Sequence, residues 1–244
     1  MERKKQTCLH CGRLVDHLYC SHCGQKITTS RFRMQQIFST DFLHGVYNIN
    51  PGILNTLKSL FVKPGHAIRD YVRGKRADFL NYFSFFILAL TLLHFVQEYS
   101  HLYVEQLFVT KINRSLLVFN DNIIHNYSKL FALFMTPVVS FATYLTFRKA
   151  HQNFAEHIVL NIFKMGYSIL IISLFYLLAI AFPNHTLLKI LYVLFFLLQM
   201  AYEFMFYFQY FSPLGYTRTQ IIIRSLFVMV FSTALLIDKW VIIF

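Results

Sequence analysis

The sequence predicts an all-α integral membrane protein: a five-span bundle of transmembrane helices, with an N-terminal mini zinc ribbon and amphipathic helices at the membrane surface. Hydrophobic residues make up 56% of the 244 positions and charged residues only 14%. Soluble globular chains average about 45–50% apolar and about 25% charged residues. Long apolar stretches follow residue 79, and all four cysteines lie near the N-terminus. This composition argues against an ordinary soluble enzyme, and also against disorder or a coiled coil.

The cysteines form two Cys-x-x-Cys pairs that we interpret as metal ligands: Cys8, Cys11, Cys20 and Cys23. A two-residue spacer lets both sulfurs of a pair face one ion, so two pairs supply the four soft ligands of a tetrahedral zinc site. We expect a positive φ at Gly12 and Gly24, which follow the pairs. Iron bound by the same four thiolates is the main alternative. The sequence therefore predicts a zinc ribbon over residues 1–30.

This zinc ion is expected to be structural, because four thiolates leave no vacant coordination position for catalysis. A ribbon of this size cannot fold on a hydrophobic core, so metal binding is expected to supply its folding free energy. Two disulfides would need an oxidising compartment, which conflicts with the cytosolic location predicted below. The nearby histidines are interpreted as polar surface residues: His10, His17 and His22.

Residues 31–78 are predicted to form basic amphipathic helices at the inner membrane surface. Residues 1–80 hold 13 of the 23 Lys and Arg but only five of the 11 acidic residues. Apolar residues recur at helical spacing over 34–46 and 53–61, and a third short helix is predicted over 66–73. The basic residues assigned to the membrane surface are Lys63, Arg69, Arg73, Lys75 and Arg76. Such helices are suited to the headgroup layer; packing against one another as an ordinary small domain is the alternative.

Residues 79–244 are predicted to form the transmembrane bundle, since five stretches approach the length of about 17–25 residues that a spanning helix needs. They cover 79–97, 129–147, 158–182, 187–211 and 219–237. The basic N-terminal region then lies in the cytosol and the C-terminus in the periplasm. Ser100–Asn126 is expected to form either a hairpin or an amphipathic helix, and Trp240 to act as an interfacial anchor.

Burying an ionisable residue inside a predicted span costs free energy, so each such residue needs a partner or a water-filled cavity. Lys164 and Glu203 lie at comparable depth from the inner edge and are expected to pair, while Arg224 either joins them or reaches the headgroups. Gln199 lies on the same helical face as Glu203. These four residues form a predicted intramembrane polar cluster, which either lines a cavity for a substrate or ion or fixes helix packing. Glu156 and His157 are explained most simply by helix capping and solvation.

Several motifs occur in a characteristic order: Cys-x-x-Cys-Gly, Tyr19-Cys20-x-x-Cys23-Gly24-Gln25, Gly52-Ile53-x-x-Thr56-Leu57, Pro64-Gly65, Tyr71 and Gly74-Lys75-Arg76. In this order, before a Phe-rich first span, residues 8–97 resemble an uncharacterised family of bacterial zinc-ribbon membrane proteins frequent in Bacteroidota, domain of unknown function 3667. The resemblance implies a bacterial inner-membrane location and a cytosolic ribbon. It implies no activity.

Signals for common catalytic sites are absent from the sequence, which has no Gly-rich phosphate loop, Gly-x-Ser-x-Gly or His-Glu-x-x-His. We therefore expect a non-enzymatic membrane scaffold or regulatory adaptor, whose ribbon docks a cytosolic partner and whose bundle self-associates. The alternative is a transporter or channel subunit working through Lys164, Glu203 and Arg224, and a lipid-modifying enzyme comes third. Nucleic acid is an improbable partner, because only Tyr19 and Phe32 are available nearby to stack on bases.

Overall fold

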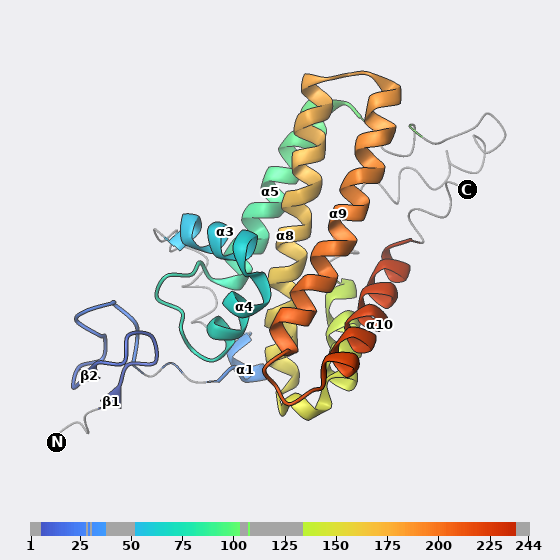
Figure 1. The fold of residues 1–244 in the computed structure, drawn as a ribbon. Coiled ribbons are helices and arrows are strands. Elements are labelled where there is room, and N and C mark those ends of the chain that lie inside the picture. The colour runs from blue at the N-terminus through green and yellow to red at the C-terminus, as the bar shows by residue number, and fades with distance from the viewer. Residues whose placement is uncertain are drawn as a thin grey trace.

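The computed structural model describes residues 6–27, 29, 31–37, 52–102, 107 and 134–237, and it is mainly helical over this part of the chain. The helices gather into a bundle with a small two-stranded ribbon beside one end (Figure 1); we call this the ribbon end. The labelled elements are β1 (Gln6–Thr7), β2 (Leu14–Val15), α1 (Met34–Ile37), α3 (Gly52–Val62), α4 (Pro64–Val72), α5 (Tyr82–Ser100), η2 (Arg148–Ala150), α8 (Phe154–Ala181), α9 (His185–Phe211) and α10 (Arg218–Ile237).

Four helices are long and apolar enough to cross a membrane by length and composition: α5, α8, α9 and α10. Their bounds lie within a few residues of four predicted spans, which confirms the membrane-like, helical character of the chain. The predicted span 129–147 is described only in part, where a further helix covers Phe134–Thr146. Its 13 residues measure about 20 Å, less than the hydrocarbon core of about 30 Å. The count of five spans therefore stays a prediction.

Asparagine side chains begin three of these helices by accepting hydrogen bonds from otherwise unpaired backbone N–H groups. Asn81 accepts from the Phe83 N–H at the start of α5, and Asn184 accepts from two N–H groups at the start of α9. At α8, Asn153 and Glu156 form a capping box, in which each side chain accepts from the backbone of the other. The capping explanation of Glu156 is therefore confirmed, whereas solvation explains neither residue, because Glu156 is 2% and His157 only 1% exposed.

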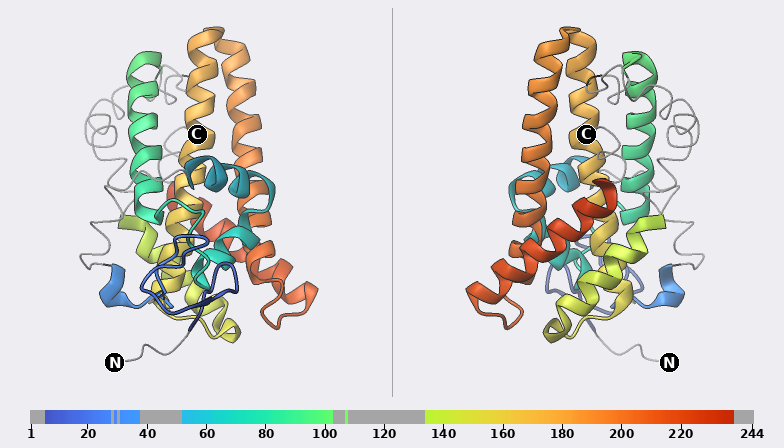
Figure 2. Two further views of the ribbon diagram at one scale, coloured as in Figure 1. Left: turned by 90° about the vertical axis from the view of Figure 1, so that its left-hand side faces the viewer. Right: turned by 90° about the vertical axis from the view of Figure 1, so that its right-hand side faces the viewer.

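Helix α8 lies at the centre of the bundle and is flanked by α5, α9 and the helix over Phe134–Thr146 (Figure 2). Much of the core around it is aromatic. Phe163 of α8 packs against Phe85 of α5, with ring centroids 5.7 Å apart. Phe147 stacks flat on Phe211 of α9, with ring centroids 3.6 Å apart. Aromatic burial of this kind explains why so many of the 28 phenylalanines lie in the bundle.

Helix α3 runs across the long axis of the bundle, not along it (Figures 1 and 2). Its inner face buries Thr56 and Leu60, and the Thr56 hydroxyl accepts a hydrogen bond from the Leu80 N–H (2.8 Å), just before α5. Its outer face exposes Leu54 (77%) and Phe61 (75%). The helix therefore carries apolar side chains both on the face packed against the bundle and on its exposed face; its place at the membrane surface stays a prediction.

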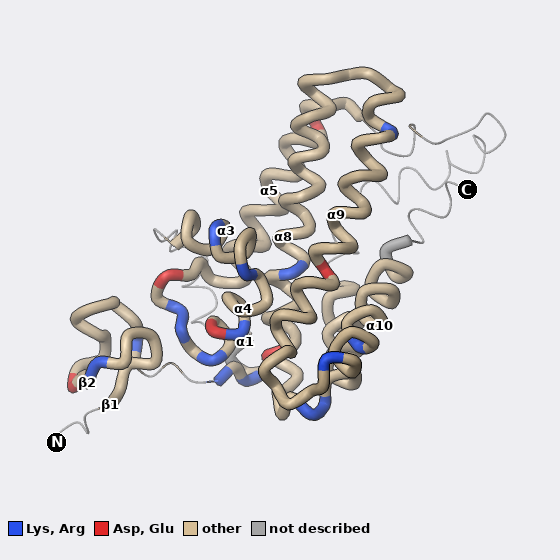
Figure 3. Tube along the Cα trace, viewed as in Figure 1, with Lys and Arg blue, Asp and Glu red and all other residues tan. Residues whose placement is uncertain are grey.

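Lysine and arginine gather toward the ribbon end of the described structure (Figure 3). This distribution agrees with the charge asymmetry on which the predicted orientation depends. Several other predictions fall outside the described residues: the helical pattern beyond Ile37, most of Ser100–Asn126, and Trp240.

Helix α4 crosses α9 at Gly65, and this contact leaves no room for a side chain. A Cβ atom added there would lie 2.4 Å from both the Phe206 carbonyl oxygen and the Tyr210 nitrogen, which are backbone atoms. We expect Gly65→Ala to lower the free energy of unfolding by about 3 kcal/mol, the upper end for overpacking, measured by thermal unfolding in detergent. Gly166→Ala is the control, because its methyl group would meet the Phe85 side chain, which can shift. An equal or larger loss at Gly166 would contradict this account.

Candidate metal centre and buried polar contacts

The four cysteine sulfurs converge on one point between the two halves of the ribbon. All four ligand atoms lie within 4.8 Å of one another, with 3.5 Å between the sulfurs of Cys8 and Cys23 and 3.6 Å between those of Cys11 and Cys20. A tetrahedral ion with Zn–S bonds of about 2.3 Å requires sulfurs about 3.8 Å apart. The cluster therefore fits a four-thiolate metal ion, and the identity of the metal stays a prediction.

Both Cys-x-x-Cys pairs have the same backbone geometry. The Gly12 N–H donates to the Cys8 carbonyl (2.9 Å), and the Gly24 N–H donates to the Cys20 carbonyl (2.8 Å). Both glycines have the expected positive φ, +75° and +71°. Since only glycine adopts this conformation without strain, these residues let each loop curl around the site.

The backbone around Cys20 favours its thiolate form, which is the form that binds a metal. The N–H groups of Cys23 and His22 are the main cause and lower the pKa of Cys20 to about 6. Desolvation acts in the opposite sense on Cys23 and raises its pKa to about 12. A bound cation would favour the thiolate form of all four sulfurs.

The ribbon is attached to the loop between α4 and α5, and Gln25 makes the central contact. Its buried amide donates to the Gly74 carbonyl (2.7 Å) and accepts from the Arg76 N–H (3.0 Å). Its own backbone carbonyl accepts from the Cys20 N–H (2.9 Å). Gln25 therefore joins a metal-binding loop directly to the basic segment before α5. His10 adds an ion pair with Asp78 at 3.1 Å.

The segment after the ribbon is pinned to the start of α8. The Arg31 guanidinium forms two hydrogen bonds of 2.7 Å with the Glu156 carboxylate, which is only 2% exposed. The Phe32 carbonyl accepts from the Asn153 side chain at 2.7 Å. The Arg76 guanidinium lies 3.6 Å from the centre of the Phe32 ring. Sequence reasoning missed the Arg31–Glu156 pair, because 125 residues separate its partners.

Inside the bundle, Lys164 and Glu203 form the expected ion pair. Their side chains are 6% and 4% exposed, and the Lys164 ammonium lies 2.7 Å from the Glu203 carboxylate. The Ser232 hydroxyl of α10 donates to the same carboxylate. The two charges therefore connect α8, α9 and α10.

The structure does not bring Arg224 into this pair. The Arg224 guanidinium donates to the Thr146 carbonyl and lies 5.3 Å from the centre of the Tyr216 ring. It therefore joins α10 to the end of the neighbouring helix. Gln199 is half-buried on α9, one turn before Glu203, and no hydrogen bond between it and the pair occurs in the described part of the chain.

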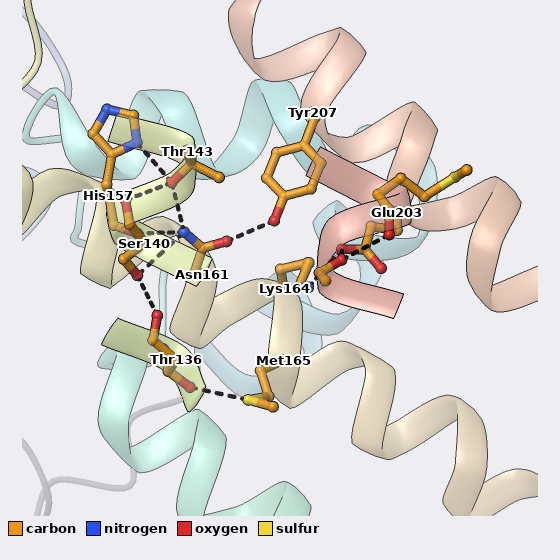
Figure 4. Close-up of polar contacts among 11 residues, drawn as sticks. Thr136, Ser140, Thr143, His157, Asn161, Lys164, Met165, Glu203 and Tyr207 are labelled. Carbon is orange, nitrogen blue, oxygen red and sulfur yellow. Dashed lines mark hydrogen bonds and ion pairs between the residues drawn. The ribbon is translucent and has the colours of Figure 1, made fainter. Parts of the chain in front are cut away.

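A second buried polar network, shown in Figure 4 beside the ion pair, was not predicted. At its centre, the Asn161 amide donates to the hydroxyls of Ser140 and Thr143 (3.2 and 3.1 Å) and accepts from the Tyr207 hydroxyl (2.7 Å). His157 contacts the Thr143 hydroxyl at 3.1 Å. Uncharged polar residues at helical spacing give little signal in a sequence, so only the structure reveals that these side chains meet.

A small cavity lies between the network and the ion pair. It is lined by Met135, Thr136, Val139, Asn161, Lys164, Met165, Ser232 and Leu235. Its free space is sufficient for about one water molecule. An organic substrate would need more room, and Lys164 and Glu203 already pair with one another, so this arrangement favours the packing interpretation over substrate binding.

Residues 51–93 match the family described as Protein of unknown function (DUF3667). The matched segment covers α3, α4, the basic loop and the first half of α5, which confirms the resemblance to this uncharacterised family over that segment. The ribbon lies outside the match, so its membership of the family pattern and a bacterial origin stay predictions. No curated protein and no solved structure matches the chain.

We expect the purified full-length protein to carry one metal ion per chain, held by the four thiolates. Cys20→Ser should reduce the metal content to near zero, because three thiolates hold the ion much less tightly than four. His22→Ala should keep its metal and serves as the control. Elemental analysis measures both; a metal-free native protein, or a metal-free His22→Ala variant, would contradict the assignment.

A second prediction concerns the buried ion pair. Glu203→Leu should lower the free energy of unfolding by about 3–5 kcal/mol, because it leaves the Lys164 ammonium buried without its carboxylate. The double variant Lys164→Met with Glu203→Leu should recover most of this loss, since an apolar pair needs no charge partner. Thermal unfolding of both proteins in detergent checks this. A double variant as unstable as the single one would argue against the pair as the cause.

Proposed function

We propose that this chain is a multi-pass protein of the bacterial inner membrane and acts as a non-enzymatic adaptor. In this proposal a structural zinc ribbon in the cytosol docks a protein partner, and the bundle holds the ribbon at the membrane. The gathering of Lys and Arg toward the ribbon end supports this orientation. Four thiols also remain reduced and available for a metal on the cytosolic side.

The contact of Gln25 with the loop over 74–76 is the observation that carries the proposal. A ribbon with no role in binding would not need a fixed position and could be joined to the bundle by a flexible linker. Here its position is fixed by a buried amide with two hydrogen bonds, by His10 with Asp78, and by Arg31 with Glu156. A fixed ribbon presents one defined surface, and binding to such a surface costs less ordering entropy.

The exposed part of the ribbon has apolar side chains that suit a protein partner. Leu14 is 72% exposed, Tyr19 55% and Leu18 44%. Apolar groups that cluster on a small exposed surface mark interaction sites, and tyrosine is enriched in interfaces. A hydrophobic docking surface therefore agrees with the chemistry of the ribbon better than an anionic partner does.

The same structure gives less support to the alternatives. Four thiolates complete the coordination of a zinc ion, which leaves no position for a substrate. Lys164 and Glu203 satisfy one another inside the bundle, and the adjoining cavity is too small for most solutes. Transport and lipid chemistry stay predictions that no observed contact favours.

The adaptor proposal predicts that partner capture depends on the exposed leucines. Full-length protein is crosslinked in its native membrane, purified, and analysed for captured cytosolic proteins. Leu14→Ser with Leu18→Ser should lose a captured protein while keeping insertion and metal content, and Cys20→Ser with Cys23→Ser should lose it together with the metal. Asp16→Ser, an exposed polar change between the two leucines, is the control and should keep the partner. Capture that the leucine variant leaves unchanged would reject the proposal.

A further inference from the structure

Helix α4 has a basic face that the adaptor proposal does not use. Lys63 precedes the helix, and His66, Arg69 and Arg73 follow at spacings of three and four residues, so these side chains lie along one face. Desolvation first, and then the charges of Arg69 and Lys63, lower the pKa of His66. The imidazole is therefore neutral at neutral pH, and three permanent cations remain.

The acidic groups around this face are already engaged. Asp70, on the same helix, pairs with Lys75 at 3.1 Å. Within the described part of the chain no carboxylate pairs with Lys63, Arg69 or Arg73. Several positive charges side by side without a counter-ion indicate that an external anion binds here.

Arg69 gives the most specific indication of that anion. One of its terminal nitrogens donates to the Gln209 carbonyl of α9 (3.2 Å), which fixes the guanidinium against the bundle. Its Nε is buried and has no hydrogen-bond partner among the described residues. The buried Nε is itself closed to an external ligand, but the side chain as a whole is only half-buried, and a planar guanidinium is well suited to a phosphate. Arg73 lies one turn further along and is exposed to solvent.

An apolar surface adjoins this basic face. Phe61 (75% exposed) and Val62 (56% exposed) immediately precede Lys63, at the end of the helix that runs across the bundle. Cations beside exposed apolar side chains suit a ligand with an anionic head and a hydrocarbon tail. A soluble phosphate would leave the apolar part of this surface without a partner.

We propose that the α4 face binds an anionic phospholipid, with Arg69 and Arg73 on its phosphate and Phe61 and Val62 against its acyl chains. Lys63 adds charge beside the headgroup. The site lies on α3 and α4 and involves no residue of the ribbon surface, so it is independent of partner docking. Since Arg69 also contacts α9, the lipid would bind a helix that is already packed on the bundle.

The test uses full-length protein in lipid nanodiscs with phosphatidylglycerol titrated against phosphatidylcholine. Native mass spectrometry counts the bound lipid. We expect preferential binding of phosphatidylglycerol, weakened about tenfold or more by Arg69→Gln with Arg73→Gln, since each charge-assisted hydrogen bond contributes strongly. Arg13→Gln with Lys149→Gln removes the same charge elsewhere and should keep the preference. Equal weakening in both double variants would overturn the site, because it would show a response to net charge alone.

Two further measurements are controls. One shows whether each variant is folded, and the other shows whether the bound anion is a lipid or a soluble phosphate. Arg69→Lys with Arg73→Lys keeps the charge and should recover part of the affinity, while the unfolding temperature in pure phosphatidylcholine shows whether each variant is folded. Inorganic phosphate at millimolar concentration should not displace the lipid. Full displacement would identify a soluble phosphate site and overturn the lipid proposal. The Leu14→Ser with Leu18→Ser variant should bind lipid normally, so failure of either proposal can be recognised separately.

Discussion

The arrangement of the bundle depends on the polar side chains that α8 buries. Between transmembrane helices, apolar packing gives little preference for one arrangement over another, because lipid tails are as apolar as leucine. Buried polar groups do give a preference, since each must find a partner. Along α8, Glu156 meets Arg31, Asn161 meets Tyr207, and Lys164 meets Glu203. The first contact holds the segment after the ribbon, and the other two both hold α9, so the polar residues of one helix specify where these neighbours lie.

The ribbon, outside the bundle, is also positioned by polar contacts. Among its described residues, the buried hydrophobic cluster consists of Cys8, Val15 and Cys20. Its shape must therefore depend on contacts with larger elements and, as predicted, on a metal ion. Gln25 takes part in the cysteine site and in a contact with the bundle. Its backbone carbonyl accepts a hydrogen bond from the Cys20 N–H, and its side chain donates to the Gly74 carbonyl in the segment before α5. The cysteine cluster, the loop before α5 and the start of α5 are thus physically connected.

The sequence was informative where the chemistry is local. Cys-x-x-Cys spacing predicts the metal cluster because its ligands lie close in the chain, and apolar stretches predict the helices because length alone limits them. The depth of Lys164 and Glu203 in their spans even predicts their pairing. Partners that lie far along the chain were not predicted: Arg224 donates to the Thr146 carbonyl, and Arg31 pairs with Glu156, 125 residues away. Such contacts depend on helix rotation and crossing, which spacing does not determine.

The segment that matches an uncharacterised family, residues 51–93, contains a separate set of contacts that join neighbouring elements. It includes Gly65, whose hydrogen atom alone permits the close crossing with α9, and Thr56, which joins α3 to the start of α5. It includes Gly74 and Arg76, which receive the ribbon. Each of these residues contacts an element other than its own and thereby joins two parts of the fold. The family match therefore coincides with the part of the chain where α3, α4, α5, α9 and the ribbon are joined.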